Sequence, residues 1–294
     1  MSRTTEQRNP ASKGIDEKSI GEILEIINNE DAKITKAINS QLPQIEEAVK
    51  KIIQTMRSGG KVYLVGAGSS GRLCVLEASE IPPTFGVSPE RIKAIIAGGV
   101  EALYTSVEAA EDDKDKASSE MDRNDVNDKD LIIGVAASGT TPFVLGAIEK
   151  AKELGAQTVG LSCNQDTLLS KLVDTSIEII VGPEIVAGST RMKAGTSQKM
   201  VLNMMTTTAM MKLGLVYDGF MVGVQATNIK LRERSKKIVA GITGTSLDEA
   251  EKALIASNWD VRIASIIILT HMSPEDVIKA LKTSTFRQVL RGDE

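Results

Sequence analysis

Two short segments of the chain combine glycine with side-chain hydroxyls, a mixture of residues that can bind a phosphate group. The first is GAGSSGR at 66–72, and the second is SGTT at 138–141. Glycine lets the backbone approach an anion, N–H groups at a helix start point toward it, and hydroxyls donate further hydrogen bonds. The candidate phosphate- and sugar-binding residues are Gly68, Ser69, Ser70, Gly71, Ser138, Gly139, Thr140 and Thr141.

Other interpretations of these segments stay open. Neither is a Walker A motif, because no Gly-Lys-Ser/Thr follows. Gly66, Gly68 and Gly71 match the GxGxxG spacing of dinucleotide-binding loops, so a nucleotide is one alternative. Tight turns and helix starts without a ligand are another. The hydroxyls in both segments favour the monophosphate of a small molecule.

Histidine and cysteine, which serve many catalytic and metal sites, are nearly absent. His271 is the only histidine, and Cys74 and Cys163 are the only cysteines. A Ser-His-Asp triad would need that one histidine, and zinc sites need several His or Cys side chains. We therefore expect no metal, and we expect acid–base chemistry to fall to carboxylates, lysine or tyrosine.

Five short apolar runs, rich in β-branched residues, predict the strands that position the hydroxyl-rich segments. They are 61–66, 93–97, 131–136, 157–162 and 177–181, with room for helices between them. Continuous apolar runs are typical of strands buried on both faces, so we expect an α/β fold with a parallel sheet. Ligands bind at the carboxyl ends of such strands, where both segments lie.

Helices are predicted on either side of this core in the sequence. Apolar residues recur at helical spacing within 18–57. The Met-rich segment 189–217 predicts a long helix whose methionines fill the core or contact a second subunit. Capped helix starts at Ser246 and Ser273 predict a C-terminal module of about three short helices.

Composition excludes several classes of function. The chain has 294 residues and a formal net charge of −4, whereas binding to a nucleic-acid backbone needs a basic excess or stripe. No apolar run reaches the length of a membrane span, and residues 1–19 lack the apolar core of a signal peptide. We expect a cytoplasmic protein with no nucleic-acid and no membrane partner, and two cysteines in apolar surroundings agree with a reducing compartment.

Six blocks of sequence, in this order and at this spacing, resemble the N-acetylmuramic acid 6-phosphate etherases. They are GAGSSGRL at 66–73, EASEIPPTFG at 77–86, IIAGG at 95–99, VEAAEDD at 107–113, AASGTTPFV at 136–144 and GSTRMKAGTSQKMVLNM at 188–204. The resemblance covers essentially the whole chain, 15–290. The second and sixth blocks are shared closely only with the related glucokinase regulatory proteins.

This resemblance implies a sugar isomerase (SIS) domain, a three-layer α-β-α sandwich around a five-stranded parallel sheet. It implies an N-terminal helical segment at 1–51, a sugar-phosphate-binding SIS domain at 52–217, and a small helical module of the ubiquitin-associated type at 218–294. It also implies a homodimer that acts on a small-molecule sugar phosphate and needs no metal and no cofactor.

The activity that the resemblance implies is cleavage of the D-lactyl ether of N-acetylmuramic acid 6-phosphate. Elimination and hydration would give N-acetylglucosamine 6-phosphate and D-lactate, a step in the recycling of cell-wall amino sugars. The family's catalytic glutamates match Glu80 and Glu111, with Glu108 a competitor one helical turn before Glu111. We expect Glu80 to be poorly solvated, because a general acid at neutral pH needs a raised pKa.

Three alternative functions stay open. An aldose–ketose isomerase would use the same domain and remove the same proton from carbon 2 of the sugar. A sugar-phosphate sensor, like the glucokinase regulatory proteins, would bind a partner protein, but those chains carry two SIS domains and this one has room for one. A transcription regulator would need a DNA-binding head, and residues 1–57 carry no basic recognition stripe.

Overall fold

The five predicted strands form one parallel sheet in the computed structural model, which describes residues 3–292 apart from the side chain of Glu108. The strands are β1 (Val62–Gly66), β2 (Ile92–Ile96), β3 (Leu131–Val135), β4 (Gln157–Ser162) and β5 (Thr175–Glu178). Their spatial order is β2-β1-β3-β4-β5. The chain therefore leaves β1 in one direction and returns to its other side as β3. Both hydroxyl-rich segments follow strands at this switch point, where ligands bind open α/β sheets.

The edge strand β5 lies at a different position from the predicted run at 177–181. It covers Thr175–Glu178, and its first residue pairs with Val159 of β4. Thr175 and Ser176 are only half-buried, which an edge strand tolerates. Ile179 and Val181 are buried beyond the strand end. The predicted and observed bounds differ because apolar residues can be buried without forming hydrogen bonds to the neighbouring strand.

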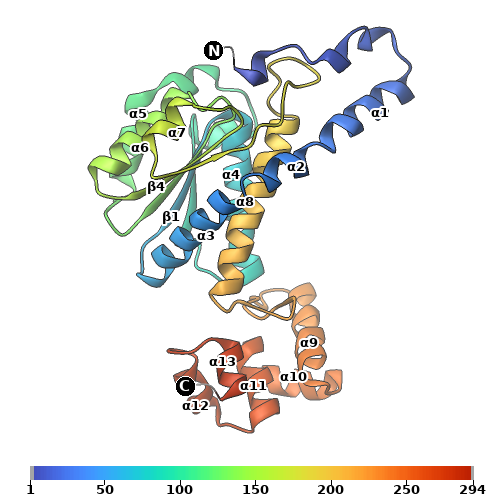
Figure 1. The fold of residues 1–294 in the computed structure, drawn as a ribbon. Helices are drawn as coiled ribbons and strands as arrows, with labels where there is room; N and C mark the ends of the chain where they lie inside the picture. Colours follow the sequence, from blue (N-terminus) through green and yellow to red (C-terminus); the bar gives the residue numbers. More distant parts are fainter. Residues whose placement is uncertain (1–2, 293–294) are drawn as a thin grey trace. The chain divides into compact units, whose positions relative to one another are not determined.

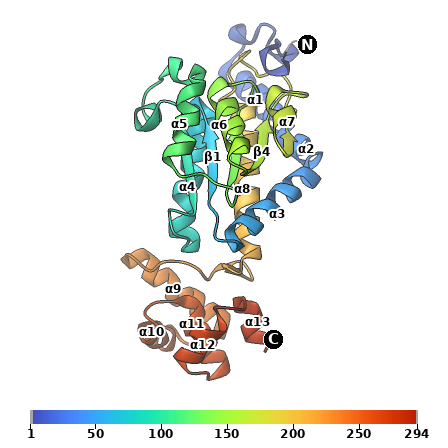
Figure 2. The ribbon, with the colours of Figure 1, turned by 90° about the vertical axis from the view of Figure 1, so that its left-hand side faces the viewer.

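Helices cover both faces of the sheet (Figures 1 and 2). One face carries α5 (Lys114–Arg123), α6 (Pro142–Glu153) and α7 (Leu168–Leu172). The other carries α3 (Leu42–Arg57) and the first parts of α4 (Gly68–Phe85) and α8 (Lys193–Lys212). Tyr63, Val65 and Ile132 point from the strands into the core cluster under α5 and α6. The predicted three-layer sandwich is confirmed.

The N-terminal segment reaches the sheet through short helical turns and two helices. The turns are η1 (Thr4–Glu6), η2 (Pro10–Ser12) and η3 (Ile15–Glu17), followed by α1 (Ile20–Asp31) and α2 (Ile34–Asn39). Ser19 and Glu22 form a capping box that starts α1. Thr5 exchanges hydrogen bonds with the side chain of Asn164, which follows β4. The first described residues are thus tied to the loop after a central strand.

The chain divides into two compact units. The first contains the residues up to Ala78 and Glu90–Thr206, and the second contains Ser79–Pro89 and the chain from Thr207 onward. The second unit holds the hairpin β6 (Val216–Tyr217) and β7 (Phe220–Met221), and then α9 (Ile229–Thr243), α10 (Leu247–Ala256), α11 (Val261–Thr270), α12 (Pro274–Ala280) and α13 (Phe286–Arg291). These elements share a core of their own around Val239, Leu254 and Phe286.

The predicted helix starts in this second unit are confirmed. Ser246 caps α10 through a capping box, and the Ser273 hydroxyl accepts a hydrogen bond at the start of α12. Four helices follow Gly244 in the described chain where about three were expected, because Asp260 begins an extra helix, α11. In residues 3–292 no single helix has the length and hydropathy of a membrane span, and only α10 and α11 together, bent by 112°, match one in length and composition.

Candidate active site

Two glycines hold the turn between β1 and α4 tight. A Cβ added to Gly66 would lie 2.8 Å from the nitrogen of Gly71, and one added to Gly71 would lie 2.6 Å from Cγ1 of Ile96 in β2. Gly68 has a φ of +51°, which glycine adopts without strain. The first turn of α4 therefore starts directly at the carboxyl end of β1, where N–H groups and the helix dipole favour an anion.

The two serine hydroxyls of this turn have different surroundings. Ser69 is half-buried and lines a cavity of about 440 Å³ between α4 and α8. Ser70 is buried, and its hydroxyl donates a 2.8 Å hydrogen bond to Oε1 of Gln198 in α8. The hydroxyl proton of Ser70 is thus used within the protein, whereas Ser69 faces a space that a ligand can enter.

The second hydroxyl-rich turn leads from β3 into α6. Oγ of Ser138 lies 3.2 Å from both the backbone nitrogen and Oγ1 of Thr140, and each can donate to it. Gly139 has a φ of +65°, and an added Cβ would lie 2.4 Å from Cβ of Thr167. Thr141 precedes α6 without capping it through its side chain. The first-turn N–H groups of α6 therefore have no side-chain cap, which suits an anion ligand.

A cavity of about 530 Å³ lies beside the first turn and contains Glu111. Two short turns that follow β2, η4 (Gly99–Leu103) and η5 (Glu108–Asp112), form its outer side. Its lining residues are Ala67, Gly68, Arg72, Ala97, Ala102, Ser106, Val107, Ala109, Glu111 and Asp112. The cavity brings together Gly68 and the exposed Glu111 from the predicted set, while residues 138–141 are not part of its lining.

Three cationic residues near these cavities were missed by the sequence reasoning. Arg72 lines both cavities, whereas Arg191 and Lys199 line only the 440 Å³ cavity. All three belong to the blocks that carry the family resemblance, and this position could have identified them as candidate site residues. The pattern of glycine and hydroxyl residues that predicts a phosphate-binding turn contains no cation, so it gives no signal for these three side chains. Among the described side chains, which do not include that of Glu108, no three His, Cys, Asp or Glu residues gather closely enough to hold a metal ion.

Glu80 lies in the second half of α4, after the point at which this helix passes from the first unit to the second. Its side chain is exposed, so the expectation that it is poorly solvated is wrong for the single chain. The neighbouring Ile81 is buried, and Pro82 and Pro83 follow within the helix. A ligand or a second subunit bound beside Glu80 would remove water from this carboxylate.

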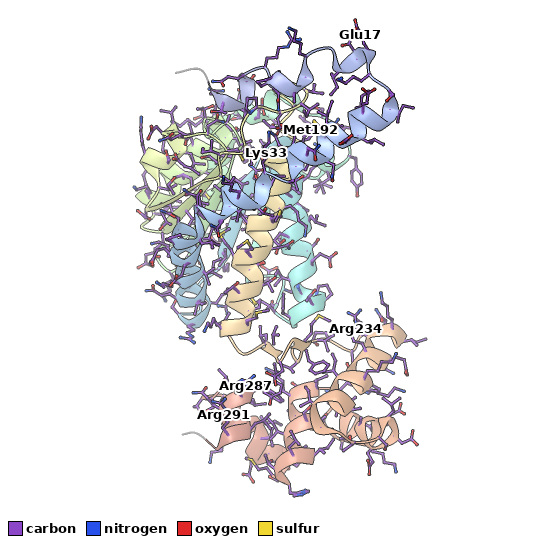
Figure 3. The ribbon with its side chains drawn as sticks, turned by 45° about the vertical axis from the view of Figure 1, so that its right-hand side comes forward. Glu17, Lys33, Met192, Arg234, Arg287 and Arg291 are labelled. Carbon is purple, nitrogen blue, oxygen red and sulfur yellow. The ribbon has the colours of Figure 1, made fainter. Side chains whose placement is uncertain are left out.

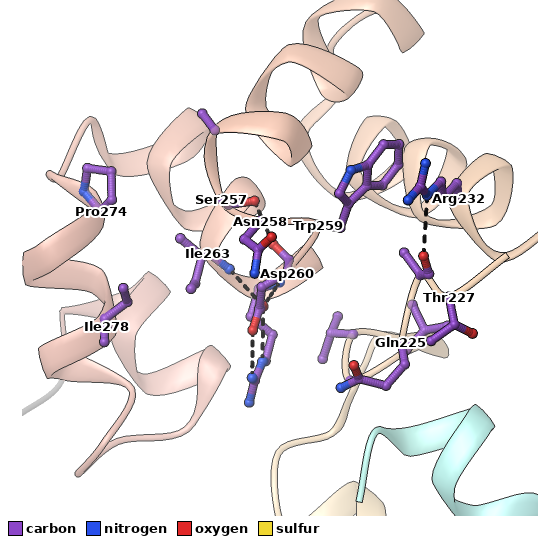
Figure 4. Close-up of a pocket in the computed structure, with 16 residues that line it drawn as sticks. Gln225, Thr227, Arg232, Ser257, Asn258, Trp259, Asp260, Ile263, Pro274 and Ile278 are labelled. Atoms are coloured by element: carbon purple, nitrogen blue, oxygen red, sulfur yellow. Dashed lines mark hydrogen bonds and ion pairs between the residues drawn. The ribbon is translucent and has the colours of Figure 1, made fainter. Parts of the chain in front are cut away.

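The second unit has a separate cavity of about 590 Å³ (Figure 4). The guanidinium of Arg232 lies 5.0 Å from the ring centre of Trp259, in a cation–π contact. Asp260 forms a 2.7 Å ion pair with Arg262 and also caps α11. None of the predicted site residues lines this cavity.

Comparisons with known proteins agree on the fold and on one family. Residues 44–152 match the model of the glucokinase regulatory protein N-terminal SIS domain, and residues 106–208 match the SIS domain model. The N-acetylmuramic acid 6-phosphate etherase of Pasteurella multocida is 47% identical over 277 residues, which are 94% of this chain and 92% of that protein. The one of Glaesserella parasuis is 48% identical over 271 residues, 92% of this chain and 89% of that protein.

A solved structure shares the fold at low sequence identity. A phosphoheptose isomerase from Francisella tularensis superposes with a TM-score of 0.52 and is 21% identical. The match covers 66% of this chain and 99% of that one.

Proposed function

Because the chain belongs to the N-acetylmuramic acid 6-phosphate etherase family, we propose that it cleaves the D-lactyl ether of N-acetylmuramic acid 6-phosphate. The products are N-acetylglucosamine 6-phosphate and D-lactate, and the reaction serves the recycling of cell-wall amino sugars. The similarity over nearly the whole length of curated relatives carries this conclusion. The enzyme is a carbon–oxygen lyase.

The reaction can proceed by acid–base chemistry alone. Opening of the sugar ring exposes an aldehyde at carbon 1, which acidifies the proton on carbon 2. A base removes that proton, the electron pair forms a carbon–carbon double bond, and the lactyl oxygen on carbon 3 leaves as it is protonated. Water then adds to carbon 3 of the unsaturated aldehyde and carbon 2 regains a proton. Each positioned proton transfer contributes about 10²–10⁴-fold in rate.

Glu80 and Glu111 are the proposed catalytic pair. Glu80 protonates the departing lactyl oxygen and later activates the water, and Glu111 removes the proton from carbon 2 or assists ring opening. The position of Glu111 in a cavity shared with Gly68 supports this assignment. The match of both glutamates to the family's motif blocks supports it as well.

The 6-phosphate is proposed to bind the turn Gly68–Gly71, with Ser138–Thr141 completing the sugar and phosphate site. Two observations support this placement. α4 begins close to the end of β1, and the Thr141 side chain does not cap the first N–H groups of α6, so these groups can bind an anion. The half-buried hydroxyl of Ser69, which lines the 440 Å³ cavity, is the better candidate donor of the two serines, because Ser70 already donates to Gln198.

The protein is proposed to act in the cytoplasm as a homodimer on a small-molecule sugar phosphate, without nucleic acid or membrane. Leu76 on α4 is 45% exposed and lines the 440 Å³ cavity with Leu73 and Met200, and this group of apolar side chains supports a subunit contact. We also propose the division into an N-terminal segment 1–51, a SIS domain 52–217 and a C-terminal module 218–294.

A coupled assay for D-lactate tests the proposed function. Purified protein incubated with N-acetylmuramic acid 6-phosphate should release D-lactate and N-acetylglucosamine 6-phosphate in equal amounts, in buffer with EDTA. Formation of a ketose phosphate with no lactate would identify an isomerase instead. Absence of both products would leave the chain without the proposed activity.

A further inference from the structure

We propose that Arg72 binds the carboxylate of the substrate's lactyl group and so selects the lactyl ether over sugar phosphates that lack it. This inference rests on the proposed function, since it names the group that recognises one part of that substrate.

The substrate carries a second anion close to the bond that breaks. Its 6-phosphate occupies one end, and the lactyl carboxylate is separated from the ether oxygen by a single carbon. The cavity that contains Glu111 also contains Asp112. A third carboxylate entering beside these two would be repelled unless a cation compensates it.

Arg72 is the one cationic side chain among the described residues that line this cavity. It lies in the first turns of α4, half-buried, next to the predicted phosphate-binding turn. In the described chain it forms no ion pair, and its one hydrogen bond runs from Nη2 to the carbonyl oxygen of Thr105, at 2.9 Å. A guanidinium has five N–H donors, so the donors that do not bind Thr105 remain available for a carboxylate.

The hydrogen bond to Thr105 also fixes where the guanidinium points. Thr105 lies between η4 and η5, and its own N–H donates to the carbonyl oxygen of Glu101 at 3.1 Å. Arg72 therefore spans from a rigid helix to the segment that leads to Glu111. A guanidinium held in this way can bind a carboxylate through two parallel hydrogen bonds, which a lysine ammonium cannot reproduce.

The other cationic side chains of the neighbouring 440 Å³ cavity do not line the cavity of Glu111. These side chains are Arg191 and Lys199. Lys199 also donates to Oδ1 of Asn203 within α8. Arg72 alone lines both spaces, so it alone can meet a carboxylate attached to an ether that Glu111 faces.

Steady-state kinetics of Arg72→Gln and Arg72→Lys test the proposal. For N-acetylmuramic acid 6-phosphate, R72Q should raise KM by about 10- to 100-fold, the value expected for loss of a charge-assisted pair, with kcat changed much less. R72K should give an intermediate KM, since lysine keeps the positive charge but cannot form two parallel hydrogen bonds to the carboxylate. The inhibition constant of N-acetylglucosamine 6-phosphate, which has the phosphate and no lactyl group, should stay within about twofold of wild type.

Arg123→Gln is the matched control, because Arg123 on α5 is exposed and pairs only with Glu120 among described residues. It removes the same charge from the first unit and should leave both constants unchanged. Equal losses for substrate and for N-acetylglucosamine 6-phosphate in R72Q would mean that Arg72 serves the phosphate or the fold, and would overturn the proposal. An unchanged KM would overturn it too.

An analogue keeps the test valid if the Arg72 variants do not fold. Wild-type enzyme should bind the analogue whose lactyl carboxylate is replaced by a carboxamide about 10- to 100-fold more weakly than the substrate. In folded R72Q this discrimination should disappear. Equal binding of carboxylate and carboxamide by wild type contradicts the inference. Absence of D-lactate release by wild type is a separate result, which defeats the proposed function itself.

Discussion

The ammonium of Lys193 and the carboxylate of Glu30 form a 2.6 Å ion pair between Nζ and Oε2, with the side chains only 2% and 7% exposed. Glu30 lies in the last turn of α1 and Lys193 begins α8, so the pair joins the N-terminal helices to a helix that lines the 440 Å³ cavity. Glu30 also pairs with Lys33, and Figure 3 labels Lys33 together with Met192, the residue that directly precedes α8. The buried Glu184 accepts hydrogen bonds from the first two N–H groups of α8.

Glu30→Gln should lower the free energy of unfolding by about 3 kcal/mol. The substitution leaves the Lys193 ammonium buried without its counter-charge, and breaking one partner of such a pair is costly. Glu46→Gln is the control, because Glu46 makes an exposed pair with Lys50 and should cost less than about 1 kcal/mol. Urea denaturation of the three proteins measures the difference. Equal losses in both variants would contradict the role of the buried pair.

The stability that Glu30 contributes should disappear in acid. Burial acts to raise the pKa of Glu30, but hydrogen bonds from Lys193, Lys33 and Asn9 outweigh it and lower this pKa from 4.5 to about 2. The folded-state pKa is the lower one, so the contribution is complete above pH 4.5 and is lost as the pH falls toward 2. The gap in unfolding free energy between wild type and Glu30→Gln should therefore narrow over that range. A gap that stays constant would be inconsistent with the lowered pKa.

Gly139→Ala should destabilise the protein by about 2–4 kcal/mol and weaken sugar-phosphate binding. The new Cβ would meet the side chain of Thr167 at 2.4 Å, in a left-handed conformation that alanine resists. Thr167 caps α7, so the clash reaches a second element. Gly21→Ala is the control, since an added Cβ in α1 meets nothing within 4 Å. Thermal unfolding and binding of N-acetylglucosamine 6-phosphate measure both effects.

Glu80→Gln and Glu111→Gln should each lower kcat for D-lactate release by about 10²–10⁴-fold. The loss is expected because an amide cannot exchange the proton that each step needs. Binding of N-acetylglucosamine 6-phosphate should persist in both variants. Glu153→Gln, at the exposed end of α6, is the matched control and should keep full activity. Near-normal turnover by either active-site variant would remove that glutamate from the mechanism.

Neither cysteine should react with a thiol reagent in the native protein at pH 8. Cys74 and Cys163 are fully buried. Burial raises the pKa of Cys163 to about 12, and burial also raises the pKa of Cys74 well above its usual range. The reactive thiolate is therefore scarce at both positions. Counting released chromophore should give no thiol in native protein and two per chain in denaturant. Rapid labelling of native protein would contradict the burial.

Much of the α/β core was predictable from local patterns. Every residue of β1 is buried because helices cover both faces of the strand, and residues 62–66 accordingly contain no charged side chain. The glycines at 66, 68 and 71 likewise predicted a tight strand–helix turn, because such a turn needs residues without a Cβ at close backbone approaches. Thr175 and Ser176 are polar and do not extend the apolar run, so the predicted position of the edge strand was wrong by a few residues.

Sequence patterns were enough to predict the five strands, apart from the bounds of β5, the hydroxyl-rich turns that follow two of them, and the family that the chain resembles. Tertiary packing, in contrast, set three features of the site: Ser70 donates to Gln198, Arg72 donates to Thr105, and Glu80 is exposed in the single chain. Backbone patterns depend on neighbours in sequence and can be read from them. Side-chain partners depend on which distant segments come into contact when the sheet and its helices pack. The spacing of residues along the chain does not predict those contacts.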